Sequence, residues 1–395
     1  MTLPLFERVL GADDAAACFA DAALLGRMLD VEVALADAEA GEGLVGADAA
    51  AVVARCRDGM VVDAAFVDRV ARDGARAGTV VVPLVAALRE AVGRIDAAAA
   101  AAVHVGATSQ DLIDTAMALA TRDALVTIDR DAGRLVAALV ALAGRHAATP
   151  ILARTLMQPA AATSFGFKVA AWAAPVARGR GRIDGAASDA LQLSFGGAVG
   201  TLASLGDRGP AVARRLGAAL GLPVPAAAHH TQRDAWVALG LALAVLCGSL
   251  GKIGRDLSLL AQGEVGELAE PTGEGRGTSS AMPHKRNPVA ALKAIAAATR
   301  APQLAATLLA AMPQAHERGL GDWQAELAAW PSLVLATAGS VRALADAAEE
   351  GFAVDTGRMR ANLEAAGIGN AIDADVKVAA DRMRELLASL NAPPT

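Results

Sequence analysis

The densest group of potentially reactive side chains lies in GRGTSSAMPHKRNP, residues 275–288. Glycines lead into two serines, a Met-Pro pair and three potential cations, and a helical pattern follows. A glycine-rich loop that ends at a helix N-terminus can close over an anion, exclude water and bring a hydroxyl to a reacting carbon. Asn287 as N-cap and Pro288 at the first helical position would explain the Asn-Pro pair alone. There is no GxxxxGK[ST] pattern, which excludes a P-loop.

A second polar group is HVGATSQDLIDTA, which begins at His104. Thr108 and Asp111 have the spacing of a capping box at the start of a helix. The same helix start, with free N–H groups beside Thr108, Ser109 and Gln110, also suits an anion, and the two interpretations are compatible. His104 is either a core histidine or a catalytic residue, and we keep it as a catalytic candidate.

Two further groups suit a carboxylate ligand. HHTQRDAW places His230, Gln232 and Arg233 at a helix start. Its His-His pair has no third ligand at a suitable spacing, so no metal site is predicted. MPQAHERGLGDWQAE, which contains Arg318, is either a charged connector between helices or part of a pocket. Arginine is informative there because its planar fork holds a carboxylate through two parallel hydrogen bonds.

The composition predicts the elements that must position these residues. The 395 residues are 54% hydrophobic, only 3% are aromatic and there is no tyrosine, which favours an all-α fold with close helix packing. The net charge is −6 and the cations are dispersed, so neither a nucleic-acid nor a membrane surface is expected. Three cysteines without zinc spacing favour a reducing cytoplasm.

The apolar periodicity predicts long helices in the middle of the chain. We expect a small N-terminal helical domain at 1–105, a central bundle of long helices at 106–350 and a shortened C-terminal helical segment at 351–395. Apolar faces on several sides of these helices predict contacts with other subunits. There is no signal peptide pattern, and the longest uncharged stretch, Ala235 to Leu250, is shorter than a membrane span and predicts a buried helix. The predicted helical segments of the bundle are 109–147, 160–192, 210–220, 232–262, 288–312 and 324–350.

The loop is also similar to a known sequence signature. TSSAMPHKRNP, 278–288, closely resembles the GSSxMPxKxNP loop of the fumarase/aspartase superfamily, and HVGATSQD resembles another of its shared regions. Four further stretches look most like the bacterial 3-carboxy-cis,cis-muconate cycloisomerases of that superfamily. The resemblance covers residues 1–350 roughly, and the four stretches are LSFGGAVGTLASLG, HTQRD, GSLGKIGRDLSLLAQGEVGE and MPQAHERGLGDWQAE.

The resemblance implies a homotetramer with a shared helical bundle and active sites assembled from three subunits. It also implies a reaction without cofactor or metal, through an aci-carboxylate, on a small tricarboxylate in the protocatechuate (β-ketoadipate) branch of aromatic catabolism. The family's loop serine falls on Ser279, and Lys285 with the loop N–H groups would have to lower its pKa. The catalytic candidates are therefore Ser279, Lys285 and His104, and the substrate-binding candidates are Thr108, Ser109, Gln110, His230, Gln232, Arg233, Ser280, Met282, Asn287 and Arg318.

Several positions depart from the family pattern. Many amine-eliminating relatives have a histidine in a Thr-His-x-Gln segment that protonates the leaving nitrogen, and here Leu156 stands at that position. A carboxylate leaves without such a proton, so Leu156 favours a cycloisomerase over adenylosuccinate or argininosuccinate lyase. Pro159 and Thr278 replace a polar residue and the signature glycine. A fumarate-releasing lyase and an inactive structural oligomer are the alternatives.

Overall fold

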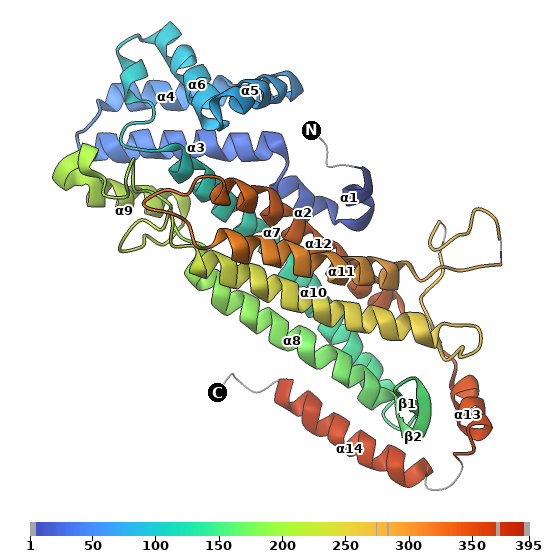
Figure 1. Cartoon of the computed structure of the whole chain (residues 1–395). Helices are drawn as coiled ribbons and strands as arrows, with labels where there is room; N and C mark the ends of the chain where they lie inside the picture. The colour runs from blue at the N-terminus through green and yellow to red at the C-terminus, as the bar shows by residue number, and fades with distance from the viewer. Residues whose placement is uncertain (1–4, 274, 283, 369–371, 391–395) are drawn as a thin grey trace.

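The computed structural model describes residues 5–273, 275–282, 284–368 and 372–390. Long helices run along one another through the middle of the molecule and give it an elongated shape (Figure 1). The prediction of an all-α protein built on long helices is confirmed. The helices of this bundle are α7 (Ser109–Arg145), α8 (Phe165–Ala190), α10 (Asp234–Leu260), α11 (Val289–Ala311) and α12 (Asp322–Glu350).

The bundle helices pack closely because small residues lie where their backbones approach. A Cβ atom on Gly251 of α10 would lie only 2.2 Å from the Cβ of Ala298 on α11. One on Gly240 would lie 2.5 Å from a methyl carbon of Leu308. Larger side chains fill the core elsewhere, and Trp330 stacks on Trp236 with ring centroids 3.8 Å apart. Alanine and glycine therefore allow close helix contacts in a chain with few aromatic residues.

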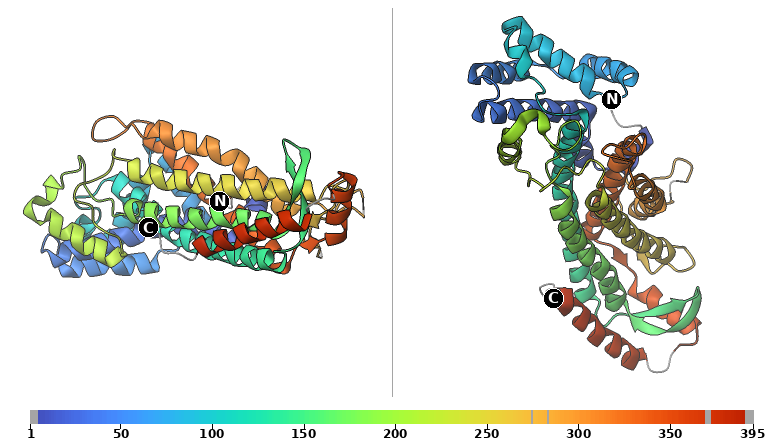
Figure 2. Two further views of the ribbon diagram at one scale, coloured as in Figure 1. Left: turned by 90° about the horizontal axis from the view of Figure 1, so that it is seen from below. Right: turned by 60° about the vertical axis from the view of Figure 1, so that its left-hand side comes forward.

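One end of the bundle carries the N-terminal helices, which lie across it (Figure 2). Helix α3 contacts both α7 and α9, so this layer is fixed directly to the start of the bundle. The elements at this end are α3 (Asp21–Gly41), α4 (Ala47–Gly59), α5 (Ala64–Ala77), α6 (Val81–Ile95), the 3-10 helices η1 (Ala99–Ala102) and η2 (Ala203–Arg208), and α9 (Gly209–Leu220). Helices α1 (Leu5–Leu10) and α2 (Asp13–Cys18) lie beside the middle of the bundle, where Arg300 of α11 pairs with Glu7 and Arg130 of α7 with Asp14.

The opposite end carries a β-hairpin and the C-terminal helices. Strands β1 (Pro150–Thr155) and β2 (Gln158–Ser164) pair antiparallel, and α14 (Ile372–Leu390) packs on β2 and α8. The predicted helix at 160–192 is wrong at its start, because 160–164 belong to β2. The other five predicted segments agree with the observed helices to within two residues at each end. The remaining elements here are β3 (Leu268–Ala269), β4 (Ala353–Val354) and α13 (Thr356–Ala365).

Two bundle helices are apolar and long enough to cross a membrane by composition alone. The most apolar windows of α10 and α12 are, however, 61% and 67% buried inside the protein. Both helices make contacts with α11 along the bundle. This burial is typical of core helices in a bundle, in agreement with the predicted buried helix at Ala235 to Leu250.

Candidate active site

The candidate residues fall into two groups at opposite ends of the bundle (Figure 1). Arg233 immediately precedes α10, whereas the loop that carries Ser279 follows the other end of that helix and leads into α11. A helix of this length spans about 40 Å. The two groups therefore do not meet within one chain. The α7 end holds His104, Thr108, Ser109, Gln110, His230, Gln232, Arg233 and Arg318, and the loop end holds Ser279, Ser280, Met282, Lys285 and Asn287.

The start of α7 is built around the carboxylate of Asp111. Thr108 and Asp111 form the capping box that their spacing predicts, and the Thr108 backbone N–H donates to Asp111 Oδ2 over 3.0 Å. The backbone N–H groups of Gly196 and Gly197 also donate to Asp111, at 3.0 and 2.9 Å. His230 Nε2 lies 2.6 Å from Asp111 Oδ1. Asp111 thus ties the helix start to two loops that are distant in sequence.

Three predicted substrate-binding residues are buried. His230 and Arg233 are 3% exposed and Gln110 is fully buried. Arg233 donates to Asp114 over 2.8 Å and also pairs with Glu326, so two carboxylates balance its charge. These side chains have buried polar partners that hold them in place, and their contact with a substrate stays a prediction.

The same network contains three residues that the sequence analysis did not select, Asp114, Trp323 and Glu326. Gln110 Nε2 donates to Asp114 Oδ2 over 3.1 Å and to the His230 carbonyl over 2.8 Å. Trp323 Nε1 donates to the other oxygen of Asp114 over 2.9 Å. Burial raises the pKa of Glu326, although the charge of Arg233 opposes this effect. Acidic residues at helical spacing within an apolar helix, as at Asp111 and Asp114, are the sequence signal for such a network.

His104 is held by a carboxylate that sequence reasoning missed. Glu32 on α3 is 1% exposed and accepts hydrogen bonds from the His104 backbone N–H at 2.9 Å and from ring Nδ1 at 2.6 Å. These two contacts fix His104 in a left-handed backbone conformation, with φ of 62°. The carboxylate selects the tautomer with a proton on Nδ1, which leaves Nε2 for another partner. The sequence signal for this contact was Glu32 itself, a charged residue among apolar residues of α3.

Neutral acceptors hold the guanidinium of Arg318 at this end of the bundle. Its Nη2 donates to the carbonyls of Gly197 and Ala198, at 3.2 and 2.9 Å, and Nη1 donates to Gln110 Oε1 at 3.3 Å. No carboxylate pairs with it among the described residues. A half-buried guanidinium that is oriented by neutral acceptors remains able to attract an anionic ligand.

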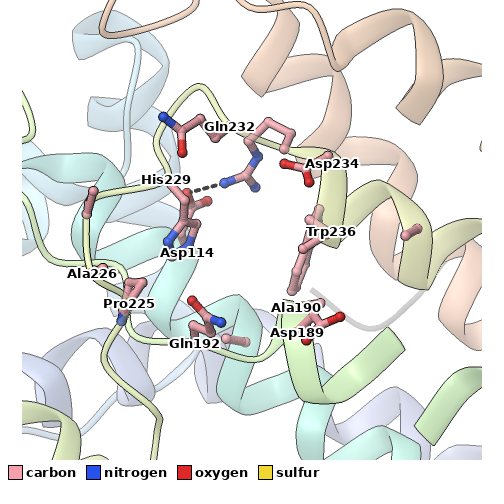
Figure 3. Close-up of a pocket in the computed structure, with 15 residues that line it drawn as sticks. Asp114, Asp189, Ala190, Gln192, Pro225, Ala226, His229, Gln232, Asp234 and Trp236 are labelled. Atoms are coloured by element: carbon pink, nitrogen blue, oxygen red, sulfur yellow. Dashed lines mark hydrogen bonds and ion pairs between the residues drawn. The ribbon is translucent and has the colours of Figure 1, made fainter. Parts of the chain in front are cut away.

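A cavity of about 590 Å³ lies beside this network, a size that suits a small ligand (Figure 3). His229 lines it, and the ring Nδ1 of His229 is buried without a hydrogen-bond partner among the described residues. Burial lowers the pKa of His229. Sequence reasoning selected the neighbouring His230 instead. The other lining residues are Asp114, Ala118, Asp189, Ala190, Gln192, Pro225, Ala226, Ala227, Gln232, Arg233, Asp234, Ala235, Trp236 and Ala238.

The loop end presents its candidate residues on a tight turn. Ser279 Oγ accepts a hydrogen bond from the Met282 backbone N–H at 3.1 Å, and the Lys285 backbone N–H donates to the Met282 carbonyl at 3.0 Å. Ser280, Met282 and Lys285 are exposed, while Ser279 is half-buried. Two further residues of this loop, Glu274 and Pro283, lie outside the described residues.

The base of the loop is closed by backbone contacts. The Asn287 backbone N–H donates to the Gly277 carbonyl over 2.8 Å, and a Cβ on Gly277 would lie 2.4 Å from the Asn287 oxygen. Gly277 has φ of 64°, so glycine is required there. Asn287 is not the N-cap that its position predicted. Glu270 instead accepts the N–H groups of Ala290 and Ala291, at 2.9 and 2.8 Å, which occupies the N-terminus of α11 with a carboxylate.

The β-hairpin ends in an exposed apolar tip. Leu156 and Met157 form a two-residue turn with φ of 49° and 65°, and they are 97% and 70% exposed. Positive φ at both positions matches the turn that the twist of a hairpin favours. The tip has no side chain that can transfer a proton. Among the residues that the structure describes, no group of three His, Cys, Asp or Glu side chains could hold a metal ion.

Comparison with known proteins identifies related sequences and structures. Residues 9–302 match the lyase family. A curated 3-carboxy-cis,cis-muconate cycloisomerase from Bradyrhizobium diazoefficiens is 48% identical over 92% of this chain and 79% of its own length. A nitrosuccinate lyase from Streptomyces davaonensis is 42% identical over 89% of this chain and 75% of its own. The crystal structure of the 3-carboxy-cis,cis-muconate lactonizing enzyme from Pseudomonas putida has a TM-score of 0.85 and 40% identity over 98% of this chain and 88% of that one.

Proposed function

The chain belongs to the lyase family, and we propose that it is a 3-carboxy-cis,cis-muconate cycloisomerase, which interconverts that tricarboxylate and 4-carboxymuconolactone. Similarity to enzymes named for this reaction extends over nearly the whole chain. The proposal places the protein in the catabolism of aromatic compounds through protocatechuate. We also propose that the chain divides into an N-terminal helical domain at 1–105, a central bundle at 106–350 and a C-terminal helical segment at 351–395.

The proposed reaction proceeds through an aci-carboxylate. In the lactone-opening direction, Ser279 removes the proton from the carbon next to a carboxylate. The electron pair of the broken C–H bond is held beside that carboxylate and then forms a C=C bond as the ring C–O bond breaks and the ring carboxylate departs. Cyclisation is the reverse. Lys285 stabilises the serine alkoxide, and Arg318 with the start of α7 binds substrate carboxylates.

The observation that carries the choice of reaction is Leu156. A leaving carboxylate is stable as an anion, whereas a leaving amine needs a proton from an acid at that position. Leu156 at the exposed hairpin tip cannot donate a proton, which supports a cycloisomerase. A fumarate-releasing lyase of the adenylosuccinate type is the second candidate, favoured by the similarity to a nitrosuccinate lyase.

We propose that the active enzyme is a homotetramer whose sites combine residues from different subunits. The separation of His104 and Ser279 by the length of α10 supports this proposal, because one chain cannot supply both to one substrate. A cytoplasmic location is supported by Cys18, Cys56 and Cys247, which are unpaired.

The first experiment measures the loss of the conjugated-diene absorbance of 3-carboxy-cis,cis-muconate with the purified wild type, Ser279→Ala and Ser280→Ala. We expect turnover by the wild type and a loss of at least about a hundredfold in kcat for Ser279→Ala, because proton transfer loses its base. The neighbouring Ser280→Ala should lose far less. Wild-type protein without turnover, but with fumarate release from a succinyl substrate, would move the assignment to a lyase.

A further inference from the structure

We propose that His229 is a binding residue at the α7 end of the bundle, where its ring hydrogen-bonds to a carboxylate of a ligand in the cavity that Gln232 and Arg233 also line. The proposal rests on the proposed function, because it takes the ligand to be a polycarboxylate. It concerns a side chain that neither the loop signature nor the capping box includes.

Two neighbouring histidines have opposite environments in this segment. His230 points into the interior, where Asp111 lies 2.6 Å from its Nε2. His229 lines the cavity of about 590 Å³ instead (Figure 3). A segment that buries one histidine in a network therefore presents the other to the cavity. Gln232, which is exposed, lines the same cavity and offers an amide N–H.

No hydrogen-bond partner in the described part of the chain fixes the ring of His229. Glu32 orients His104, Thr149 lies 3.1 Å from the ring of His146, and Asp111 holds His230. The Nδ1 atom of His229, in contrast, is buried with no hydrogen-bond partner among the described residues. A buried polar atom without a partner is rare in native proteins and marks a place where a ligand or water completes the structure.

The charged groups around the ring set its protonation state, and the ligand class comes from the proposed function. Burial lowers the pKa of His229, with Asp114 and Asp111 opposing this effect and Arg233 and His230 adding to it, which favours the neutral imidazole. Asp189 and Asp234 also line the cavity from α8 and α10. A ligand carboxylate that contacts the ring would favour the protonated imidazole. Binding should therefore take up a proton and strengthen as the pH falls.

The test combines turnover with binding of propane-1,2,3-tricarboxylate, an unreactive tricarboxylate, measured by calorimetry in buffers of different ionisation enthalpy. The proteins are the wild type, His229→Ala, His229→Gln and, as a control outside the cavity, His146→Gln. We expect His229→Ala to raise both Kd and KM about tenfold, since a hydrogen bond to a charged group is lost. His229→Gln should recover part of the affinity but none of the proton uptake, and His146→Gln should behave as the wild type does.

The outcomes separate the two proposals. Turnover by the wild type, with unchanged KM, Kd and proton uptake in folded His229 variants, would overturn the role of His229 and leave the cycloisomerase in place. Tricarboxylate binding with His229-dependent proton uptake, but no turnover by the wild type, would overturn the reaction and retain the binding residue. A wild type that neither binds nor turns over would overturn both.

Discussion

At the scale of single residues, buried carboxylates hold the side chains of the α7 end in place. Asp111, Asp114 and Glu326 balance or orient the groups around Arg233, and Glu32 orients His104. Each is at most 6% exposed. A carboxylate in this setting is costly to bury alone but holds its hydrogen-bond donors strongly. We therefore expect the proposed substrate-binding and catalytic residues of this end to depend on these buried acids.

Glu32→Gln tests this dependence at His104. The amide offers only one acceptor oxygen to the two donors of His104, so the ring loses its fixed orientation. We expect kcat/KM to fall about ten- to a hundredfold, as for a displaced acid–base group, while the protein stays folded. Steady-state kinetics, together with a measured unfolding transition, would separate a loss of activity from a loss of stability. Glu32→Asp should retain more activity than Glu32→Gln. A folded Glu32→Gln variant with normal kcat/KM would show that the reaction does not depend on the orientation of His104.

At the scale of single elements, helix α3 is notable for a second buried glutamate. Glu39 is fully buried, seven positions after Glu32, and neither of its oxygens has a hydrogen-bond partner among the described residues. Burial raises the pKa of Glu39 from 4.5 to about 8, and the charge of Glu32 adds to this rise. The folded protein therefore holds this proton at pH values where the unfolded chain has released it.

The contribution of Glu39 to the free energy of unfolding should fall as the pH rises from 4.5 to about 8. The sign follows because the folded state binds more protons than the unfolded state in this interval, with a limiting slope of about 1.4 kcal/mol per pH unit from this one group. Glu39→Met should remove this contribution and stabilise the protein near pH 8. Urea unfolding of the wild type and Glu39→Met at pH 5.5 and 8 would measure this contribution to the free energy of unfolding. An equal pH dependence in the two proteins would show that Glu39 does not retain its proton.

The sequence predicted elements well where the signal is local and periodic. Helix α7 begins at the capping box of Thr108, and the apolar repeat of α10 continues to its end. The hairpin was missed because Leu156 and Met157 adopt positive φ without the glycine or asparagine that usually marks such turns. The cap of α11 was misassigned because Glu270 lies about 20 residues earlier in the chain. Long-range partners of this kind leave no local pattern.

The distribution of the site over the whole molecule was likewise not deducible from residue types. Arg233 and Arg318 are equally basic in the sequence, but two buried carboxylates balance Arg233 whereas neutral acceptors hold Arg318. Only the fold decides which arginine has carboxylate partners and which has neutral ones. The division of the candidates between two ends follows from the antiparallel course of α10 and α11, which returns the chain to the α7 end after the loop.

Mixed tetramers test whether sites are shared between chains. Ser279→Ala and His104→Ala should each be inactive alone, because each removes one half of every site. If the two halves come from different chains, random reassembly of equal amounts should restore about a quarter of the wild-type activity, since one site in four then combines an intact Ser279 with an intact His104. Dissociating the two variants together in mild denaturant, removing it and following diene absorbance would measure this recovery. As a control, each variant is reassembled alone. No recovery in mixtures that form hybrid tetramers would mean that both residues serve a site from the same chain, which would require a large rearrangement of the loop along the bundle.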